Sequence, residues 1–189
     1  VFCAGVDLKE REKGTDLNIP EPGKAFVLPN PAGGLDLALR RVEKPTLAAI
    51  NGPAVGMGCD LALTCDLRIA SEKATFREPY VLIGSVASAG PYYLPRLVGL
   101  ARTFEMLYLG DQIDAREAER IGLVNKVVPP EDLEKATLEL ATRLAEAHPW
   151  AVRFIKHAVY TGLEGGLEDT LDYVTHARAI AFHTRDSAE

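Results

Sequence analysis

Residues 49–66 read AINGPAVGMGCDLALTCD, and they join an extended apolar end, a glycine-rich loop and an apolar segment that carries one early acid, Asp60. Gly52, Gly56 and Gly58 permit backbone angles and close approaches that other residues avoid. Each costs about 0.5–1 kcal/mol relative to alanine in a regular element. We therefore expect this loop to have a function that offsets the cost.

The residues around this loop predict a parallel α/β unit. Residues 46–50 (TLAAI) predict a strand, residues 57–65 an apolar helix, and residues 66–71 (DLRIAS) a second strand. A strand, a tight loop, a helix and a strand in that order are typical of parallel sheets. Residues 74–80 (ATFREPY) predict a further extended segment.

The residues before this unit predict a long loop and a helix. Residues 14–34 carry four prolines, which prevent helix propagation, so we expect a long surface loop of the kind that is often functional. Residues 35–42 (LDLALRRV) have helical spacing, and Pro45 ends that helix.

After the α/β unit the pattern changes to helices. Within residues 110–128 we expect a short helix with Asp114 as N-cap, then a strand that ends before Pro129. Leucines and a threonine repeat at helical spacing over residues 133–144, with Pro130 at the helix start. Two more amphipathic helices are predicted at 149–161 and 167–182. We therefore predict an α/β core at 1–128 and a helical C-terminal region at 129–189.

Composition and charge exclude several classes of protein. The chain is 47% hydrophobic and 25% charged, which is typical of a globular protein and not of a disordered one. Its formal net charge of −6 argues against nucleic acid or an anionic membrane as the main partner. No apolar run approaches the length needed to span a bilayer, which is about 18 residues.

Three cysteines, Cys3, Cys59 and Cys65, have neither an even number nor the spacing of a zinc site. We expect them to be reduced, which favours a cytoplasmic location. The chain opens at Val1 in what reads as the end of a strand, so we expect a fragment that lacks N-terminal strands and a last helix.

The glycine loop differs from the well-known phosphate-binding loops. Its spacing is neither GxGxxG nor GxxxxGK[ST], and the residues around Ser88 (VASAG) lack the first glycine of a nucleophile elbow. A glycine loop that leads into a helix N-terminus instead offers free N–H groups, the material of an oxyanion hole. The alternative, a tight turn without a ligand, stays open from this loop alone. The stretch FCAGVDLKE at residues 2–10 repeats the pattern and favours the oxyanion hole.

Four stretches together resemble the crotonase (enoyl-CoA hydratase/isomerase) family. They are FCAGVDLKE (2–10), KPTLAAINGPAVGMGCDLALTCDLRIAS (44–71), ATF followed by a proline and IG (74–84), and GDQIDAREAERIGLVNKVV (110–128). Each stretch alone is weak evidence for the family. Together they are specific, because they occur in the same order as in the family and extend over most of the chain. The resemblance implies the α/β superhelix of strand-strand-helix units of ClpP/crotonase-like proteins, followed by a helical trimerisation region.

The resemblance also implies an enzyme that acts on coenzyme A thioesters. In this family two backbone N–H groups hold the thioester oxygen as it becomes an enolate, and by position they belong here to Val6 and Met57. Met57 replaces a usual glycine, so its side chain must find room. The residues expected to bind substrate around these amides are Ala4, Gly5, Asp7, Leu8, Gly56, Gly58 and Ser88.

A hydratase of this family typically has two glutamates that share a water. Asp60 stands at the first position, where we expect it to act as general acid/base. Tyr80 stands at the second, and its ordinary pKa near 10 makes it a poor base but a good hydrogen-bond donor. In an extended strand Glu78 points to the same side as Tyr80, so we include it among the catalytic candidates. That Glu78 is a solvated carboxylate at a strand edge stays open.

We therefore expect an enzyme of hydratase or isomerase type that is a homotrimer or a hexamer of two trimers. Coenzyme A would be part of the substrate, with no separate cofactor and no metal. Two alternatives stay open, namely another crotonase chemistry (thioester hydrolysis, decarboxylation or a ring-forming or ring-opening lyase) and an acyl-CoA-binding member with weak catalysis. At Ser88, where family members that isomerise dienes carry an acid, the sequence does not support that activity.

Overall fold

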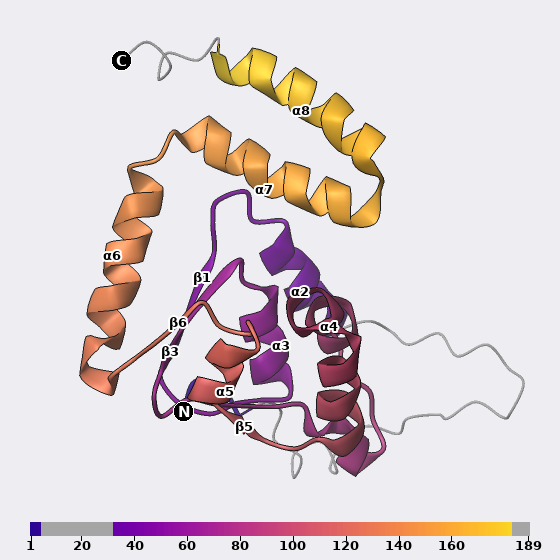
Figure 1. Cartoon of the computed structure of the whole chain (residues 1–189), viewed down its shortest axis with the longest axis vertical. Coiled ribbons are helices and arrows are strands. Elements are labelled where there is room, and N and C mark those ends of the chain that lie inside the picture. Colours follow the sequence, from indigo (N-terminus) through magenta and orange to yellow (C-terminus); the bar gives the residue numbers. More distant parts are fainter. Residues whose placement is uncertain (5–31, 183–189) are drawn as a thin grey trace, which may run out of the picture.

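The computed structural model describes residues 1–4 and 32–182, and its strands form two small sheets (Figure 1). In the described residues the strands are β1 (Leu47–Ile50), β2 (Ala54–Val55), β3 (Leu67–Ser71), β4 (Thr75–Arg77), β5 (Ile113–Asp114) and β6 (Lys126–Val128). One sheet has the order β1-β3-β6 and is parallel throughout. In the other, β2 and β4 pair in parallel and β4 and β5 antiparallel. The predicted parallel α/β arrangement is confirmed.

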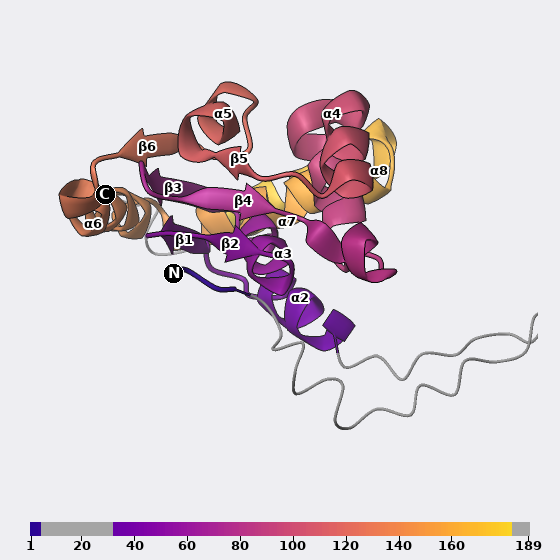
Figure 2. The ribbon, with the colours of Figure 1, turned by 90° about the horizontal axis from the view of Figure 1, so that it is seen from below.

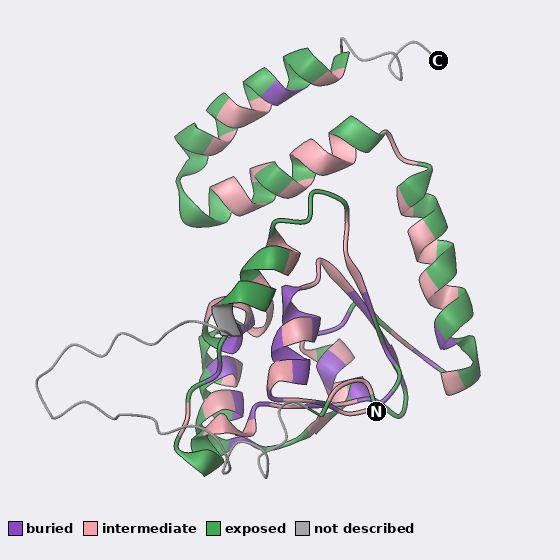
Figure 3. Ribbon diagram, turned by 180° about the vertical axis from the view of Figure 1, so that it is seen from behind, coloured by how far each residue is buried: buried purple, intermediate pink, exposed green. Residues whose placement is uncertain are grey.

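Helices connect and flank these strands. They are α2 (Ala32–Arg40), α3 (Met57–Thr64), α4 (Gly90–Leu109) and α5 (Ala115–Arg120), with the 3-10 helices η1 (Pro79–Ile83) and η2 (Pro130–Asp132). The sequence predicts α3 within one residue, and Asp114 accepts the N–H of Glu117 at 2.8 Å as the expected N-cap of α5. Figure 3 shows that the buried residues gather at α3 and the strands next to it. The largest fully buried apolar side chains are Phe76, Ile50, Leu63, Leu94 and Leu123.

The three helices predicted at the C-terminal end are confirmed as α6 (Leu133–Ala145), α7 (Pro149–Glu164) and α8 (Leu167–Phe182). Helix α6 and helix α4 lie at opposite ends of the sheets (Figure 2). Helix α7 packs antiparallel to α8, which lies outside it and away from the strands (Figure 1). Many large apolar side chains on α7 and α8 are consequently exposed.

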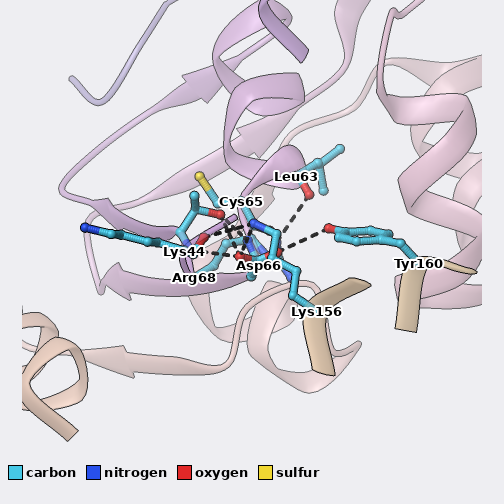
Figure 4. Close-up of polar contacts among 8 residues, drawn as sticks. Lys44, Leu63, Cys65, Asp66, Arg68, Lys156 and Tyr160 are labelled. Atoms are coloured by element: carbon cyan, nitrogen blue, oxygen red, sulfur yellow. Dashed lines mark hydrogen bonds and ion pairs between the residues drawn. The ribbon is translucent and has the colours of Figure 1, made fainter. Parts of the chain in front are cut away.

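The side chain of Asp66 fastens α7 to the sheets (Figure 4). Its Oδ2 accepts the N–H and the hydroxyl of Thr46 at 2.8 and 2.9 Å and lies 2.7 Å from Lys156 Nζ. Its Oδ1 accepts the Tyr160 hydroxyl at 3.2 Å. The side chains of Lys156 and Asp66 are only 10% and 20% exposed, so this ion pair is shielded from water. One carboxylate thus joins the start of β1 to the middle of α7.

Arg68 of β3 binds the carboxyl end of helix α3. Its guanidinium donates to the carbonyls of Cys65 and Leu123 at 2.6 and 2.7 Å, and more weakly to those of Ala62 and Leu63. Figure 4 shows Arg68 beside Cys65 and Leu63. A positive group at the carboxyl end of a helix offsets the negative end of its dipole. The buried arginine therefore caps α3.

The structure differs from the sequence predictions in three places. Helix α4 is missing from them, because Gly99 at φ 76° interrupts it and Pro95 lies inside it. The extended segment ends at Arg77, since Glu78 caps the 3-10 helix η1. Helix α2 begins at Ala32, whereas the loop was expected to reach residue 34. Most of that loop lies outside the described residues.

We predict that Asp66→Ala weakens the attachment of α7. The change removes the anionic partner of the Lys156 ammonium, which among the described residues keeps only the Lys44 carbonyl at 3.2 Å, and the acceptor of the Tyr160 hydroxyl, at a cost of about 2–4 kcal/mol. The melting temperature should fall by roughly 5–10 °C. Glu72→Ala is the control, because it breaks an exposed ion pair with Arg116 and should cost under about 1 kcal/mol. Equal melting temperatures for the two variants would contradict the prediction.

Candidate active site

The first glycine motif and the loop of residues 49–66 lie side by side as far as the structure describes them. Cys3 forms a parallel bridge with Ala54, and its carbonyl accepts the N–H of Val55 at 3.0 Å. Ala4 therefore lies next to the loop that precedes α3. Four residues of the expected site, Gly5, Val6, Asp7 and Leu8, lie outside the described residues.

Two glycines permit the close packing at this junction. A Cβ atom on Gly58 would lie 2.1 Å from the Cys3 carbonyl oxygen, so no side chain fits there. Gly56 has a φ of 55°, and the position of its missing Cβ is 3.6–3.8 Å from the ring and hydroxyl of Tyr80. The Tyr80 side chain thus covers the loop immediately before Met57.

The amide of Met57 is the first of helix α3. The first hydrogen bond along the helix runs from the Asp60 N–H to the Gly56 carbonyl at 2.9 Å, so the N–H groups of residues 57–59 have no acceptor within α3. Such amides, at the positive end of the helix dipole, favour a negatively charged oxygen. The Met57 side chain, which replaces the usual glycine, is partly exposed.

The Asp60 carboxylate lies one turn further into α3 and is fully buried. Its Oδ1 accepts the N–H groups of Ala89 and Gly90, at 2.9 and 2.7 Å, at the start of α4. Its Oδ2 accepts the Tyr80 hydroxyl at 2.8 Å and the hydroxyl and N–H of Ser88 at 3.0 and 3.3 Å. Five donors thus converge on one carboxylate, and each is electrically neutral.

Tyr80 is held as a neutral phenol. Burial and then the charge of Asp60 raise the pKa of Tyr80 well above its ordinary value of 10. Because the phenol proton is directed at Asp60, the lone pairs of the hydroxyl oxygen are free to accept from another molecule. Tyr80 is therefore placed to hold a water and not to act as an independent base.

Glu78 is buried, with 1% of its surface exposed, so its interpretation as a solvated strand-edge carboxylate is wrong. The reason is that the chain turns into η1 after Arg77, which places this side chain beside Cys59 of α3. Neither carboxyl oxygen has a hydrogen-bond partner among the described residues. Burial and the charge of Asp60 raise the pKa of Glu78 to about 9. Glu78 is consequently a neutral carboxylic acid at pH 7.

The sequence predictions missed one acid at this site, Asp36 of α2. Its Oδ2 lies 3.0 Å from the Ser88 hydroxyl, which also lies 3.0 Å from Asp60 Oδ2. Burial and the charge of Asp60 raise the pKa of Asp36, while hydrogen bonds with Ser88 and Thr64 oppose the rise. The only signal in the sequence is a single acid in an apolar helical stretch, which does not indicate what the acid faces.

A cavity of about 260 Å³ lies beside this group of acids. Its lining consists of Asp36, Leu37, Arg40, Ser88, Ala89, Tyr92, Tyr93 and Glu164. The arrangement combines amides without an acceptor inside α3, a phenol, a buried carboxylate and two further acidic side chains, Asp36 and Glu78. Such a set can hold a developing oxyanion and can move protons beside it.

The chain is similar to curated and solved proteins over its whole length. A family model described as enoyl-CoA hydratase/isomerase matches residues 1–188. The chain is 36% identical over 189 residues, all of its length, to a short-chain-enoyl-CoA hydratase of Clostridium acetobutylicum, of which it covers 70%. It is 41% identical over 152 residues to a crotonyl-CoA hydratase of Syntrophomonas wolfei, covering 80% of this chain and 58% of that protein.

A solved structure gives the same result for the fold. The crystal structure of an enoyl-CoA hydratase from Bacillus anthracis matches with a TM-score of 0.88 and 35% identity, over 100% of this chain and 71% of that one. The fold expected from the sequence is therefore confirmed.

We predict that Glu78→Gln stabilises the protein increasingly as pH rises. An unfolded glutamate loses its proton near pH 4.5, whereas folded Glu78 keeps it to about pH 9. Between these values the unfolded state binds fewer protons, so the stability of the wild type falls as pH rises. Glutamine does not ionise in either state, so its contribution to stability does not fall as pH rises. Melting curves at pH 5 and pH 9 should show a gain that grows by about 5 °C or more.

The control for this experiment is Glu131→Gln, which changes an exposed acid in η2. Its effect on the melting temperature should be small at both pH values. If the gain from Glu78→Gln is the same at pH 5 and pH 9, Glu78 does not retain its proton in the folded state.

Proposed function

Because the chain belongs to the enoyl-CoA hydratase/isomerase family, we propose that it hydrates an enoyl-CoA thioester. The observation that carries the proposal is the Tyr80–Asp60 pair, because the Tyr80 side chain covers Gly56, just before the amides that have no acceptor within α3. A buried carboxylate that polarises a phenol, next to a site for an oxyanion, suits the addition of water beside a thioester. Coenzyme A would be part of the substrate.

In this proposal the Met57 N–H, with that of Val6, holds the thioester oxygen while it carries negative charge as an enolate. The positive end of the α3 dipole adds to the stabilisation. These donors are fixed before the reaction begins, so little reorganisation opposes the transition state.

Asp60 acts in the proposal as an acid/base through the groups that it holds. The oxygens of Asp60 already accept five hydrogen bonds, which leaves little room for a water. The water therefore donates to the Tyr80 oxygen, and the Tyr80 hydroxyl donates to Asp60. Glu78 contributes as an uncharged acid whose oxygens have no partner among the described residues and can orient water or substrate. Gly56, Gly58 and Ala4 would line the path of the thioester.

We predict that Tyr80→Phe lowers kcat for crotonyl-CoA by about 100-fold, because the ring still covers Gly56 but the phenol no longer links water to Asp60. The full-length protein would be assayed by the loss of absorbance of the conjugated thioester, with products identified by mass spectrometry. Tyr108→Phe, which changes an exposed tyrosine of α4, should leave the rate unchanged.

The same assay separates hydration from the other chemistries. Hydration adds the mass of water, isomerisation leaves the mass unchanged, and thioester hydrolysis releases free coenzyme A. A protein that only binds acyl-CoA would give a calorimetric signal without turnover. Absence of turnover with every enoyl-CoA tested would contradict the proposed function.

We also propose that the protein assembles as a homotrimer or as two trimers through α7 and α8. Large apolar side chains are exposed on these helices, and a cavity of about 620 Å³ opens between β1, α6 and α7. The exposed residues include Ile155, Val159, Leu163, Leu167 and Leu171. Exposed apolar surface on this scale favours contact with another chain. None of the described helices is long and apolar enough to cross a membrane.

Light scattering of the full-length protein tests the assembly. The wild type should have the mass of a trimer or hexamer, and Ile155→Glu with Val159→Glu should shift it to a monomer. Leu138→Glu, the same kind of change at an exposed position of α6, is the control and should leave the mass unchanged. A monomeric wild type would contradict the proposal.

A further inference from the structure

We propose that Asp36 is the second acid of this site and that it holds a proton which Ser88 can exchange with Asp60. The inference rests on the proposed function, because it identifies the group that protonates the substrate. Three side chains carry it, and they come from α2, α3 and the segment before α4. Ser88 joins the other two.

The first argument is a count of hydrogen atoms. The Ser88 hydroxyl oxygen lies 3.0 Å from Asp36 Oδ2 and 3.0 Å from Asp60 Oδ2. A hydroxyl has one hydrogen, so it can donate to only one of these oxygens. If both acids were ionised, the second contact would bring two lone-pair-bearing oxygens together without a proton. The geometry therefore requires a proton on one of the two carboxyl groups.

The second argument decides which acid holds the proton. Within the described residues, every other hydrogen bond to the Asp60 carboxylate comes from a donor, namely the Tyr80 hydroxyl and the N–H groups of residues 88–90. A proton on Asp60 would displace one of them. Among the described residues, the groups that hydrogen-bond with Asp36 are only the side chains of Ser88 and Thr64. The proton thus lies on Asp36, which donates to the Ser88 oxygen, while Ser88 donates to Asp60.

The charged and titratable groups around Asp36 are consistent with this assignment. On its own helix, Arg40 forms an ion pair with Glu164 of α7 and donates to the Tyr92 hydroxyl of α4 at 2.9 Å, so its charge is directed elsewhere. Tyr93 of α4 also faces the cavity. Asp60 of α3 and, beyond it, Glu78 are the remaining acids. The negative charge nearest to Asp36 therefore opposes its ionisation.

The third argument is access. Asp60 is 0% exposed, whereas Asp36 lines the cavity of about 260 Å³ together with Ser88. Asp36 is thus the member of the pair that can meet a bound molecule. Tyr80 donates to the same Asp60 oxygen as Ser88, Oδ2, and its side chain covers the loop before Met57. A continuous chain of hydrogen bonds therefore leads from the loop before Met57 to the cavity. It runs through Tyr80, Asp60, Ser88 and Asp36.

In hydration this chain carries one proton from water to substrate. The water proton moves to the Tyr80 oxygen as the Tyr80 proton moves to Asp60, and the remaining hydroxide bonds to the β carbon. The electrons of the double bond form the enolate, and its α carbon takes the proton of Asp36. Asp60 then returns its proton to Asp36 through Ser88, which restores every side chain. The net change is the addition of one water.

The test compares Asp36→Asn with the wild-type full-length protein. Asparagine keeps the size and can donate to Ser88, but it has no proton to transfer. We expect kcat for crotonyl-CoA to fall by about 100-fold with little change in KM. The wild-type rate should decline as pH rises and Asp36 loses its proton, and this limb should be absent from the variant, whereas a decline near pH 9 from Glu78 should remain in both proteins. Asp111→Asn, at an exposed position after α4, should keep the wild-type rate and profile.

Ser88 variants test the link between the two acids. Ser88→Ala should lower kcat by about 10-fold, and Ser88→Thr, which retains a hydroxyl, should restore most of it. A loss in Ser88→Thr equal to that in Ser88→Ala would contradict the exchange through this hydroxyl. Circular dichroism would establish that each variant is folded.

Carbon-13 NMR of labelled aspartate carboxyl groups gives a readout that does not depend on turnover. One aspartate should titrate above its ordinary pKa of 3.8, and its signal should be missing from Asp36→Asn. If the wild type turns over no enoyl-CoA, the proposed function fails, and this titration alone decides whether Asp36 holds the proton. An ordinary titration of Asp36, or an Asp36→Asn variant with full activity, would overturn the inference.

Discussion

The arrangement of the site depends on one buried charge, the carboxylate of Asp60. Burying an ion costs several kcal/mol unless other groups replace its hydration. Here the replacement comes from neutral donors on η1, on the segment at Ser88 and at the first amides of α4. Because each donor must meet the same two oxygens, the carboxylate fixes these three segments relative to α3. The positive end of α4 supplies part of the compensation.

No cation from the described part of the chain contacts the Asp60 carboxylate, and that has consequences for the neighbouring acids. A second negative charge close by would be opposed by the first without compensation. Glu78 accordingly keeps its proton to about pH 9, and Tyr80 remains a phenol. The site therefore holds several acidic groups but few charges. Neutral acids beside one carboxylate provide both a proton donor and a proton acceptor at the same pH.

The elements that the sequence predicts well are those that local patterns determine. Three examples are the apolar run of α3, the Asp114 cap of α5 and the leucine stripe of α6. The residues that form each of these patterns are only a few positions apart in the sequence. Helix α4 was missed because Gly99 and Pro95 disrupt its local signal, whereas its packing against α3 maintains it. The paired glycine motifs and Asp60 could also be identified, because each motif is local.

The environment of the acids could not be predicted in the same way. The burial of Glu78 results from the turn into η1 and from packing on Cys59, which lies nineteen positions earlier in the chain. The contact of Asp36 with Ser88 joins residues 52 positions apart. Such contacts depend on how the helices pack, and nothing in the neighbouring sequence specifies them.

The cavity beside Asp36 is also connected to the C-terminal helices. Arg40 of α2 lies over the ring of Tyr160, 4.1 Å from its centroid, and forms an ion pair with Glu164 at the end of α7. Glu164 also accepts the Tyr92 hydroxyl at 3.2 Å and forms part of the cavity wall. The position of α7, which Asp66 fixes from the other side, therefore helps to shape the space that Asp36 faces. Contacts that hold α7 in an assembly would consequently also hold this wall of the site.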